Sequence, residues 1–202
     1  MTAAGRTNTR DIARAAVRAE LGQVAFELFR RDGFDKVTVD DLARAAGVSR
    51  STFLRYFATK EDAVLSALES DSEAKGERVA EALRARAADE DDWTALRRVL
   101  AKAALEPYHQ DPAAALALTR LIRDTPALCD RRLAKQHRWR PALAHALAER
   151  GGSPEPTLAH WVRASAALDC LNAAVDHWSD SEGTLDLVGL LNEAFAALAP
   201  EG

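Results

Sequence analysis

The chain has 202 residues, of which 48% are hydrophobic and 6% aromatic, and its formal net charge at pH 7 is −4. This length is enough for one large domain or two small ones with a real core. The acidic balance excludes a protein that binds nucleic acid through bulk positive charge, so a nucleic-acid surface would have to be a local cationic face.

Cysteine content and the lack of long apolar segments indicate where in the cell the protein is expected. Two distant cysteines, Cys129 and Cys170, do not make a disulfide framework, which favours a reducing environment. The first residues lack the apolar core of a signal peptide, and no window has the ~18–20 apolar residues of a membrane span. We therefore expect a cytoplasmic protein without membrane contacts.

The fold class follows from the balance of helix formers and breakers. Ala, Leu, Arg and Glu are abundant, Pro counts 7 and Gly 10, and alternating Val/Ile/Thr runs are nearly absent. We therefore expect an all-α fold of about nine helices and no sheet.

The first two helices have clear end signals. One is expected from Thr9 to the "RDGF" run, where Gly33 is the C-cap candidate. The second begins at Thr38, which forms a capping-box-like pair with Asp41 three residues later, and Gly47 ends it after about two turns.

A third helix opens at Ser49 over "SRSTFLRYF", and Thr59 with Asp62 begins a fourth that extends to about residue 88, with a bend near Gly76. Proline and glycine punctuation predicts five more helices, at about 93–106, 112–123, 126 to the "RGGSPEP" loop with a bend near Pro141, 157–179 and 184–198.

Two short helices around one glycine form a helix-turn-helix, which can present a free helix face to the major groove of double-stranded DNA. Phe53 and Phe57 are expected to point inward. The base-facing candidates, which point outward, are Arg50, Ser51, Thr52 and Arg55. The phosphate-facing candidates are Thr38, Tyr56 and Lys60. An alternative is an ordinary short helix pair with solvated cations, as in a protein-interaction adaptor.

The segment "VTVDDLARAAGVSRSTFLRYFATKED", preceded by "AFELFRRDGFDKVTV", resembles the TetR family of transcriptional regulators over about residues 10–68. The resemblance implies an all-helical homodimer on a palindromic operator, usually a repressor released by a small-molecule effector. It also implies a DNA-binding domain at 1–57, closed by the start of the fourth helix to about 68, and a ligand-binding and dimerisation domain at 58–202. The base- and phosphate-facing residues above match the family's positions, but Leu54 stands where the family usually carries an aromatic residue.

The resemblance also directs attention to the C-terminal helices. The dimer-interface candidates are Leu168, Leu171, Val175, Leu187, Leu191 and Ala194, and the alternative for each is the core of the single chain. The ligand-lining candidates are Trp93, Tyr108, Leu121, Trp139, Trp161, Cys170 and Trp178, again with plain core packing as the alternative. The many small alanines suit an elongated apolar ligand such as an acyl chain.

Other chemistries find little support. The sequence contains no GxSxG, GxGxxG or P-loop motif, and its five histidines show no metal-ligand spacing, so we expect no enzyme, metal or cofactor. The basic run "DRRLAKQHRWR", residues 130–140, is expected to be a solvated face or to meet an acidic ligand group.

Overall fold

The computed structural model describes residues 9–68, 72–87 and 89–199, and the chain divides into two compact units, Met1–Ser70 and Asp71–Gly202. Every regular element of the described residues is helical, with twelve α-helices and one π-helical segment. The expectation of an all-α fold is confirmed. The α-helices exceed the expected nine because two expected helices are each divided by a break and because α7, after the expected 93–106 helix, was not expected.

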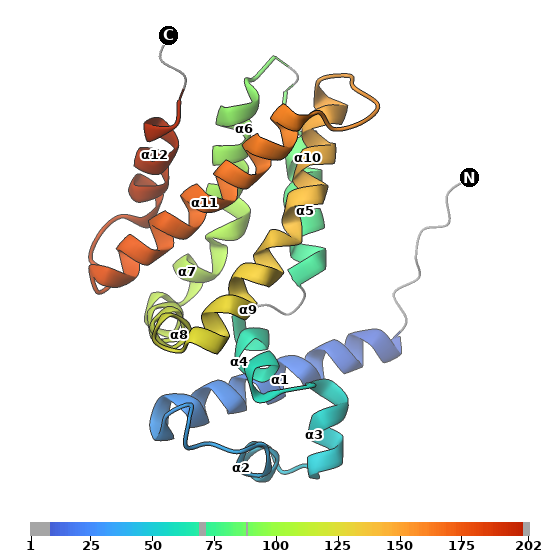
Figure 1. The fold of residues 1–202 in the computed structure, drawn as a ribbon. Coiled ribbons are helices and arrows are strands. Elements are labelled where there is room, and N and C mark those ends of the chain that lie inside the picture. Colours follow the sequence, from blue (N-terminus) through green and yellow to red (C-terminus); the bar gives the residue numbers. More distant parts are fainter. Residues whose placement is uncertain (1–8, 69–71, 88, 200–202) are drawn as a thin grey trace. The chain divides into compact units, whose positions relative to one another are not determined.

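The first unit holds four helices: α1 (Thr9–Asp32), α2 (Val39–Ala45), α3 (Arg50–Tyr56) and α4 (Lys60–Leu68). The long α1 packs against α4 and α2, and α2 packs against α3 (Figure 1). With seven residues each, α2 and α3 are too short to be stable alone, so buried side chains have to hold them. Phe29, Leu42, Phe53, Phe57 and Leu65 supply this core, each less than 2% exposed.

Two glycines set the turns of this unit. Gly33 after α1 has φ +87° and Gly47 between α2 and α3 has φ +66°, a left-handed conformation that other residues adopt only at a steric cost. Both were expected as helix ends, and both are confirmed. The expected starts of α2 at Thr38 and α3 at Ser49 are also confirmed.

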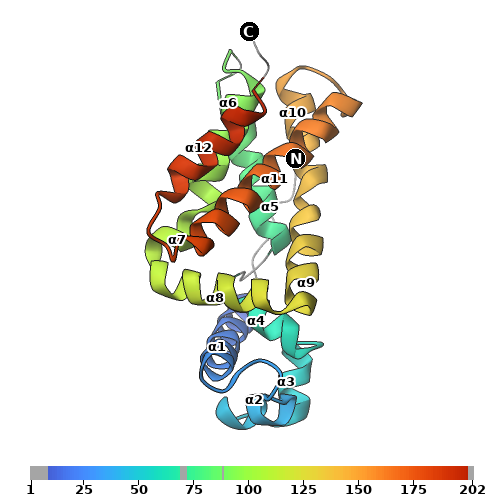
Figure 2. The ribbon, with the colours of Figure 1, turned by 60° about the vertical axis from the view of Figure 1, so that its left-hand side comes forward.

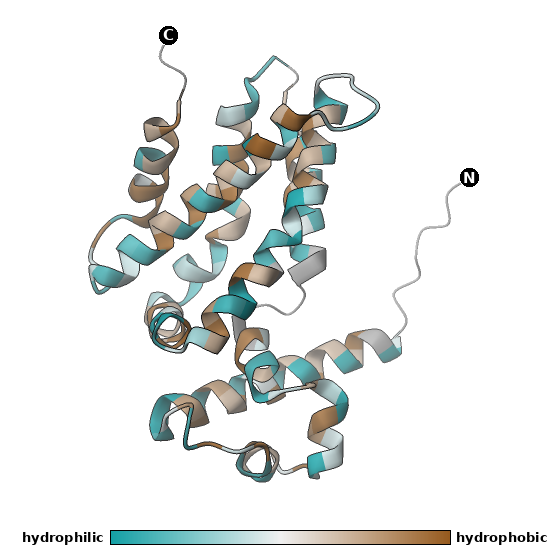
Figure 3. Cartoon of the chain, in the orientation of Figure 1, coloured by the Kyte–Doolittle hydropathy of each residue, from teal (hydrophilic) through white to brown (hydrophobic). Residues whose placement is uncertain are grey.

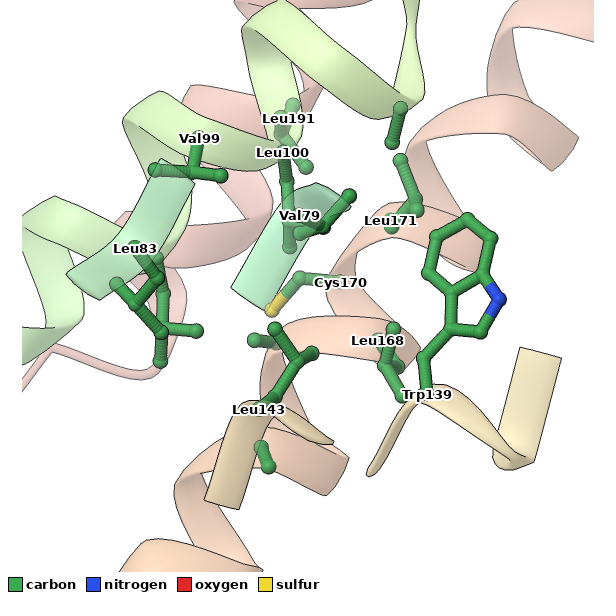
Figure 4. Packing of buried hydrophobic residues seen from close by; sticks show 14 of the residues in the cluster. Val79, Leu83, Val99, Leu100, Trp139, Leu143, Leu168, Cys170, Leu171 and Leu191 are labelled. Carbon is green, nitrogen blue, oxygen red and sulfur yellow. The ribbon is translucent and has the colours of Figure 1, made fainter. Parts of the chain in front are cut away.

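The second unit holds the remaining elements: α5 (Ser72–Arg84), α6 (Asp92–Val99), η1 (Leu100–Ala104), α7 (Glu106–Gln110), α8 (Pro112–Asp124), α9 (Pro126–His137), α10 (Trp139–Arg150), α11 (Leu158–Asp180) and α12 (Leu187–Ala197). α10 lies along α5 and α11, and α11 lies along α12 (Figure 2). Their facing side chains form one cluster, which Figure 4 shows around Leu143, Cys170 and Trp139. Figure 3 shows that α12 is the most uniformly hydrophobic of these helices.

Three expected helices differ from the structure. The helix expected from about 59 to 88 is found as α4 and α5, and residues 69–71 and 88 lie outside the described residues. The expected bend near Gly76 is absent, because α5 continues through it. Gly76 is instead needed for close packing, since a Cβ atom there would lie 2.7 Å from Cδ1 of Trp139.

Prolines explain the other two differences. Pro107 was expected to stop a helix, but it lies in the first turn of α7, where a missing N–H leaves no hydrogen bond unmade. α6 ends earlier, at the π-helical η1. The bend expected near Pro141 is a break at Arg138, because Pro141 also occupies the first turn of a new helix, α10. The last helix begins at Leu187 rather than at about 184, since Asp186 caps it.

Candidate nucleic-acid interface and ligand pocket

The N-terminus of α2 is closed by a complete capping box. Thr38 donates its hydroxyl to Oδ2 of Asp41 at 2.6 Å and its backbone N–H at 3.0 Å, and the Asp41 N–H donates to Thr38 Oγ1 at 3.2 Å. The hydroxyl and amide of Thr38 lower the pKa of Asp41 to about 2. A carboxylate therefore already occupies the positive end of this helix, and a phosphate at Thr38 would have to share that end with Asp41.

The first turn of α3 is fixed by a second cap. Ser49 Oγ accepts from the backbone N–H of Thr52 at 3.1 Å, donates to Thr52 Oγ1 at 2.9 Å, and lies 3.0 Å from Ser51 Oγ. Behind this turn Phe53 and Phe57 are buried with ring centroids 5.2 Å apart, so both point inward as expected. This packing turns the opposite face of α3 outward.

The outward face of α3 is cationic. Arg50 and Arg55 are exposed, and no acidic residue lies in the first turn of α3. Nη1 of Arg50 lies 3.3 Å from Oδ2 of Asp40 on α2, an exposed ion pair across the turn. The guanidinium of Arg55 lies 5.6 Å from the ring centre of the half-buried Tyr56. Leu54 is exposed on the same short helix.

Lys60 has a structural role that its sequence position does not reveal. Its Nζ donates to the backbone carbonyls of Phe34 at 2.9 Å and Val37 at 3.3 Å, and lies 4.2 Å from the centre of the Phe34 ring. The ammonium group thereby ties the loop between α1 and α2 to the start of α4. One of its three donors is left for a phosphate.

The seven ligand candidates lie in or against the core of the second unit, except Leu121, which is half-buried on α8. Trp139, Cys170 and Trp178 are buried (Figure 4 shows the first two), and Trp93, Tyr108 and Trp161 are half-buried against the same cluster. Nε1 of Trp93 donates to the Phe195 carbonyl at 2.9 Å, and Tyr108 meets Trp178 edge-on at 5.4 Å. Burial raises the pKa of the Cys170 thiol, which contacts the Ala194 carbonyl at 3.5 Å.

The described part of this unit has a pocket of about 390 Å³ between α9, α10 and α11. Its wall includes Asp169 and four residues of the basic run: Leu133, Gln136, His137 and Arg140. None of the seven ligand candidates lines it, but the dimer candidate Leu168 does.

Of the six dimer candidates, five are buried within the single chain and Ala194 is half-buried. The large apolar side chains that α11 leaves exposed are instead Leu158, 79% exposed, and Val162, 57% exposed. Among the described residues no cluster of three acidic, histidine or cysteine side chains could hold a metal ion. None of the helices described is both long and apolar enough to span a bilayer.

Family models match both units. Residues 23–67 match the model of bacterial regulatory proteins of the tetR family, and residues 90–201 match the model of the MftR C-terminal domain. A putative mycofactocin biosynthesis transcriptional regulator, MftR of Mycobacterium tuberculosis, is 55% identical over 40 residues, 20% of each chain. The HTH-type transcriptional regulator TcmR of Streptomyces glaucescens is 33% identical over 140 residues, 67% of this chain and 60% of that protein. The chain thus spans between a fifth and three fifths of the length of these relatives.

Solved structures give the same fold. The transcriptional regulator FadR of Bacillus subtilis superposes with a TM-score of 0.63 at 22% identity, over 90% of this chain and 97% of that one. FadR of Thermus thermophilus superposes with a TM-score of 0.57 at 22% identity, over 92% of this chain and all of that one. With a capped helix pair that presents a cationic α3, and with family models that together cover most of its length, the chain belongs to the TetR family of bacterial transcriptional regulators.

Proposed function

We propose that this protein is a sequence-specific DNA-binding transcriptional regulator that acts in the cytoplasm as a homodimer, and that it is a repressor which a small-molecule effector releases from a palindromic operator. The observation that carries this proposal is the outward face of α3. Two buried phenylalanines and the Ser49 cap fix the helix, and its exposed side carries two arginines with no acid in the first turn.

Base contacts are assigned to Arg50, Ser51, Thr52 and Arg55. An arginine can engage guanine through two hydrogen bonds, worth roughly 1–3 kcal/mol of discrimination against another base. Asp40 holds the guanidinium of Arg50 before DNA binds, which limits the orientations that have to be frozen in the complex. Leu54 could add a contact to a thymine methyl group.

Phosphate contacts are assigned to Thr38, Tyr56 and Lys60. Such contacts position a protein on the duplex without reading its sequence. The Lys60 ammonium bridges two loop carbonyls and keeps one donor for phosphate, so this residue supports the interface in two ways.

A homodimer would place two α3 helices in successive major grooves, about 34–36 Å apart. The proposed interface is the outer surface of α11 and α12, with Leu158 and Val162 as apolar contacts. The six candidates Leu168, Leu171, Val175, Leu187, Leu191 and Ala194 would support this surface from the core beneath it.

The effector is proposed to bind in the second unit, near the seven ligand candidates Trp93, Tyr108, Leu121, Trp139, Trp161, Cys170 and Trp178. The FadR structures from B. subtilis and T. thermophilus hold stearoyl-CoA and lauroyl-CoA, and an acyl chain would suit the apolar cluster around Cys170. Release would follow if the effector binds better to the state whose α3 helices are wrongly spaced.

The experiment is selection of bound sequences from random duplex DNA at two salt concentrations. We expect enrichment of a palindrome with half-sites about one helical turn apart, and an affinity that falls steeply with salt. Arg50→Ala and Arg55→Ala should relax the base preference, whereas Lys60→Ala should weaken all sequences about equally.

Arg30→Ala is the matched control, because Arg30 is also an exposed, ion-paired arginine of the first unit but lies on α1. It should leave both affinity and preference unchanged. If no sequence is enriched and Arg50→Ala behaves like Arg30→Ala, the helix pair is only structural and the adaptor alternative gains.

A further inference from the structure

The pocket between α9, α10 and α11 borders the apolar cluster proposed for the effector, since Leu168 belongs to both. Its volume is about 390 Å³, within the ~300–1,000 Å³ range of small-molecule sites. Its wall combines the apolar Leu133 and Leu168 with six polar side chains: Gln136, His137, Arg140, Ser165, Asp169 and Asn172. This composition differs from that of a core defect, which would be lined by apolar side chains.

Two polar groups of this wall are available to a ligand in the pocket. Nε of Arg140 is buried and, among the described residues, has no hydrogen-bond partner. Gln136 is only 8% exposed, and within the described part of the chain its carboxamide makes no hydrogen bond, so it lines the pocket without a protein partner. Buried polar atoms in folded proteins are almost always hydrogen-bonded, so the unpartnered Nε indicates that another molecule completes this wall.

The guanidinium of Arg140 is held in place without being neutralised. Its Cζ atom lies 5.7 Å from the centre of the Trp161 ring, which stabilises the cation by its π-face. Among the residues described, Arg140 forms no ion pair, and its five N–H donors make it a natural partner for a carboxylate. The Gln136 amide can donate to the same anion.

The α11 side of the pocket carries a negative group. Asp169 is exposed on α11 and lines the same pocket, and within the described residues its carboxylate forms no ion pair. Arg132, the nearby arginine of the basic run, is already engaged, since it donates to Asn172 at 2.9 Å and lies 3.6 Å from Asp176. Among the described residues, the pocket therefore presents the guanidinium of Arg140, the exposed imidazole of His137 and the carboxylate of Asp169 beside an apolar patch formed by Leu133 and Leu168.

We propose that this pocket binds a small amino carboxylate with an apolar side chain, that is, a molecule of the amino-acid class. Its carboxylate meets Arg140 and Gln136, its ammonium group meets Asp169, and its side chain lies against the two leucines. The proposal goes beyond the DNA-binding function, and it can be tested without knowledge of the operator.

The test is calorimetric titration of the full chain, without DNA, with leucine, isoleucine, valine, methionine and phenylalanine as probes. Each is taken to about 10 mM, where a ligand with a Kd near 1 mM (about −4.1 kcal/mol) would fill most sites. At least one amino acid should bind. Its analogues that lack either the amine or the carboxylate, such as 4-methylvalerate and isoamylamine for leucine, should bind at least about tenfold more weakly.

Two variants locate the site. Arg140→Gln should weaken binding at least about tenfold, whereas Arg138→Gln, an exposed arginine two residues earlier, should not. Gln136→Leu should also weaken binding at least about tenfold, because the ligand carboxylate loses one of its two proposed partners.

Three outcomes would overturn the proposal. One is that no amino acid binds at 10 mM. Another is equal binding of the single-charge analogue or of inorganic phosphate, which would mean an anion site rather than a zwitterion site. The last is unchanged binding by both Arg140→Gln and Gln136→Leu, which would place the bound molecule elsewhere on the chain.

Discussion

Arg150, the last residue of α10, is the side chain whose replacement we expect to cost the second unit most. Its guanidinium is 4% exposed and donates to four backbone carbonyls: Leu83 at 3.2 Å, Arg86 at 2.9 Å, Ala87 at 3.0 Å and Glu90 at 2.9 Å. Its Nε also lies 3.4 Å from Asp92 Oδ1. One side chain thus closes the C-terminal end of α5 and holds the segment that leads to α6.

The magnitude follows from what Arg150→Met would leave behind. A methionine fills a similar length but donates nothing, so up to four carbonyls and one carboxylate lose a charge-assisted partner. Breaking a buried ionic network by removing one member costs about 3–5 kcal/mol. Local relaxation lets water reach some carbonyls, so the penalties of about 1–3 kcal/mol for each orphaned group do not simply add. Arg150→Lys keeps the charge but has three donors instead of five, and we expect about half the loss.

Tryptophan fluorescence isolates the affected unit, because all four tryptophans of the chain lie at or beyond residue 93. Urea unfolding followed by this signal should give an unfolding free energy about 3–5 kcal/mol lower for Arg150→Met. For a unit of this size each kcal/mol corresponds to about 3–5 °C in melting temperature. Arg163→Met is the matched control, since Arg163 contacts the same Asp92 at 3.5 Å but is 49% exposed. Exposed ion pairs contribute about 0–1 kcal/mol, so its loss should be small.

The comparison of the two variants decides the matter. A loss below about 1 kcal/mol for Arg150→Met, or one equal to that of Arg163→Met, would refute the argument that burial makes Arg150 indispensable. It would mean that the 85–91 segment refolds locally around water without its arginine.

Three further changes have defined outcomes. Lys60→Met should speed amide exchange in the loop 33–38 by roughly fivefold, since about 1 kcal/mol of hydrogen bonding to that loop is lost, as measured by hydrogen exchange. Asp41→Asn should destabilise α2 at neutral pH, but less and less as pH falls from about 4 towards 2. The reason is that Thr38 holds the pKa of Asp41 at about 2, below its ordinary 3.8, so the bonds to the ionised carboxylate are lost only in that window; α2 resonances during urea unfolding at several pH values would report it. Gly76→Ala should lower the melting temperature seen by tryptophan fluorescence, because overpacking Trp139 costs about 1–3 kcal/mol, more than the ~1 kcal/mol that alanine gains in a helix.

Each of these has a contrary result. Unchanged exchange in Lys60→Met would mean that the loop is held by Phe34 alone. If the destabilisation by Asp41→Asn does not vary between pH 4 and 2, the ionised carboxylate of Asp41 does not stabilise the start of α2. A higher melting temperature for Gly76→Ala would show that the indole of Trp139 moves aside at little cost.

The helix-turn-helix was predictable because its signals are local. A threonine with an acid three residues later satisfies two backbone donors of a helix start, and a glycine permits the left-handed turn, whatever the rest of the chain does. Thr38 with Asp41 and Gly47 obeyed these rules, and so did the inward Phe53 and Phe57. The same rules misplaced the breaks at Pro107 and Pro141, because a proline ends one helix and begins the next equally well.

Contacts between different helices could not be predicted from the sequence. The Asp40–Arg50 pair joins two helices across the turn, and the bonds of Lys60 to Phe34 and Val37 span more than twenty residues. Nothing in the spacing of these residues distinguishes them from solvated charges. These contacts exist only because α1, α2, α3 and α4 pack as they do, and they give Arg50 and Lys60, both candidates for DNA contact, a second role within the protein.

The apolar faces of α11 and α12 show the same limit at a larger scale. Leu168 and Leu171 fit a dimer stripe by their spacing, yet both are only 5% exposed in the single chain, whereas Leu158 and Val162, four residues apart on the same helix, face outward. A helix that is apolar over more than one stripe serves the core with one face and leaves another for a partner, and periodicity alone does not say which is which. Leaving Leu158 and Val162 in water is unfavourable. Covering them with a second subunit would stabilise the assembly by about 25 cal/mol for every Å² of apolar surface removed from water. An interface argued from exposure therefore begins at Leu158 and Val162, whereas Leu168 and Leu171 belong to the core of the single chain.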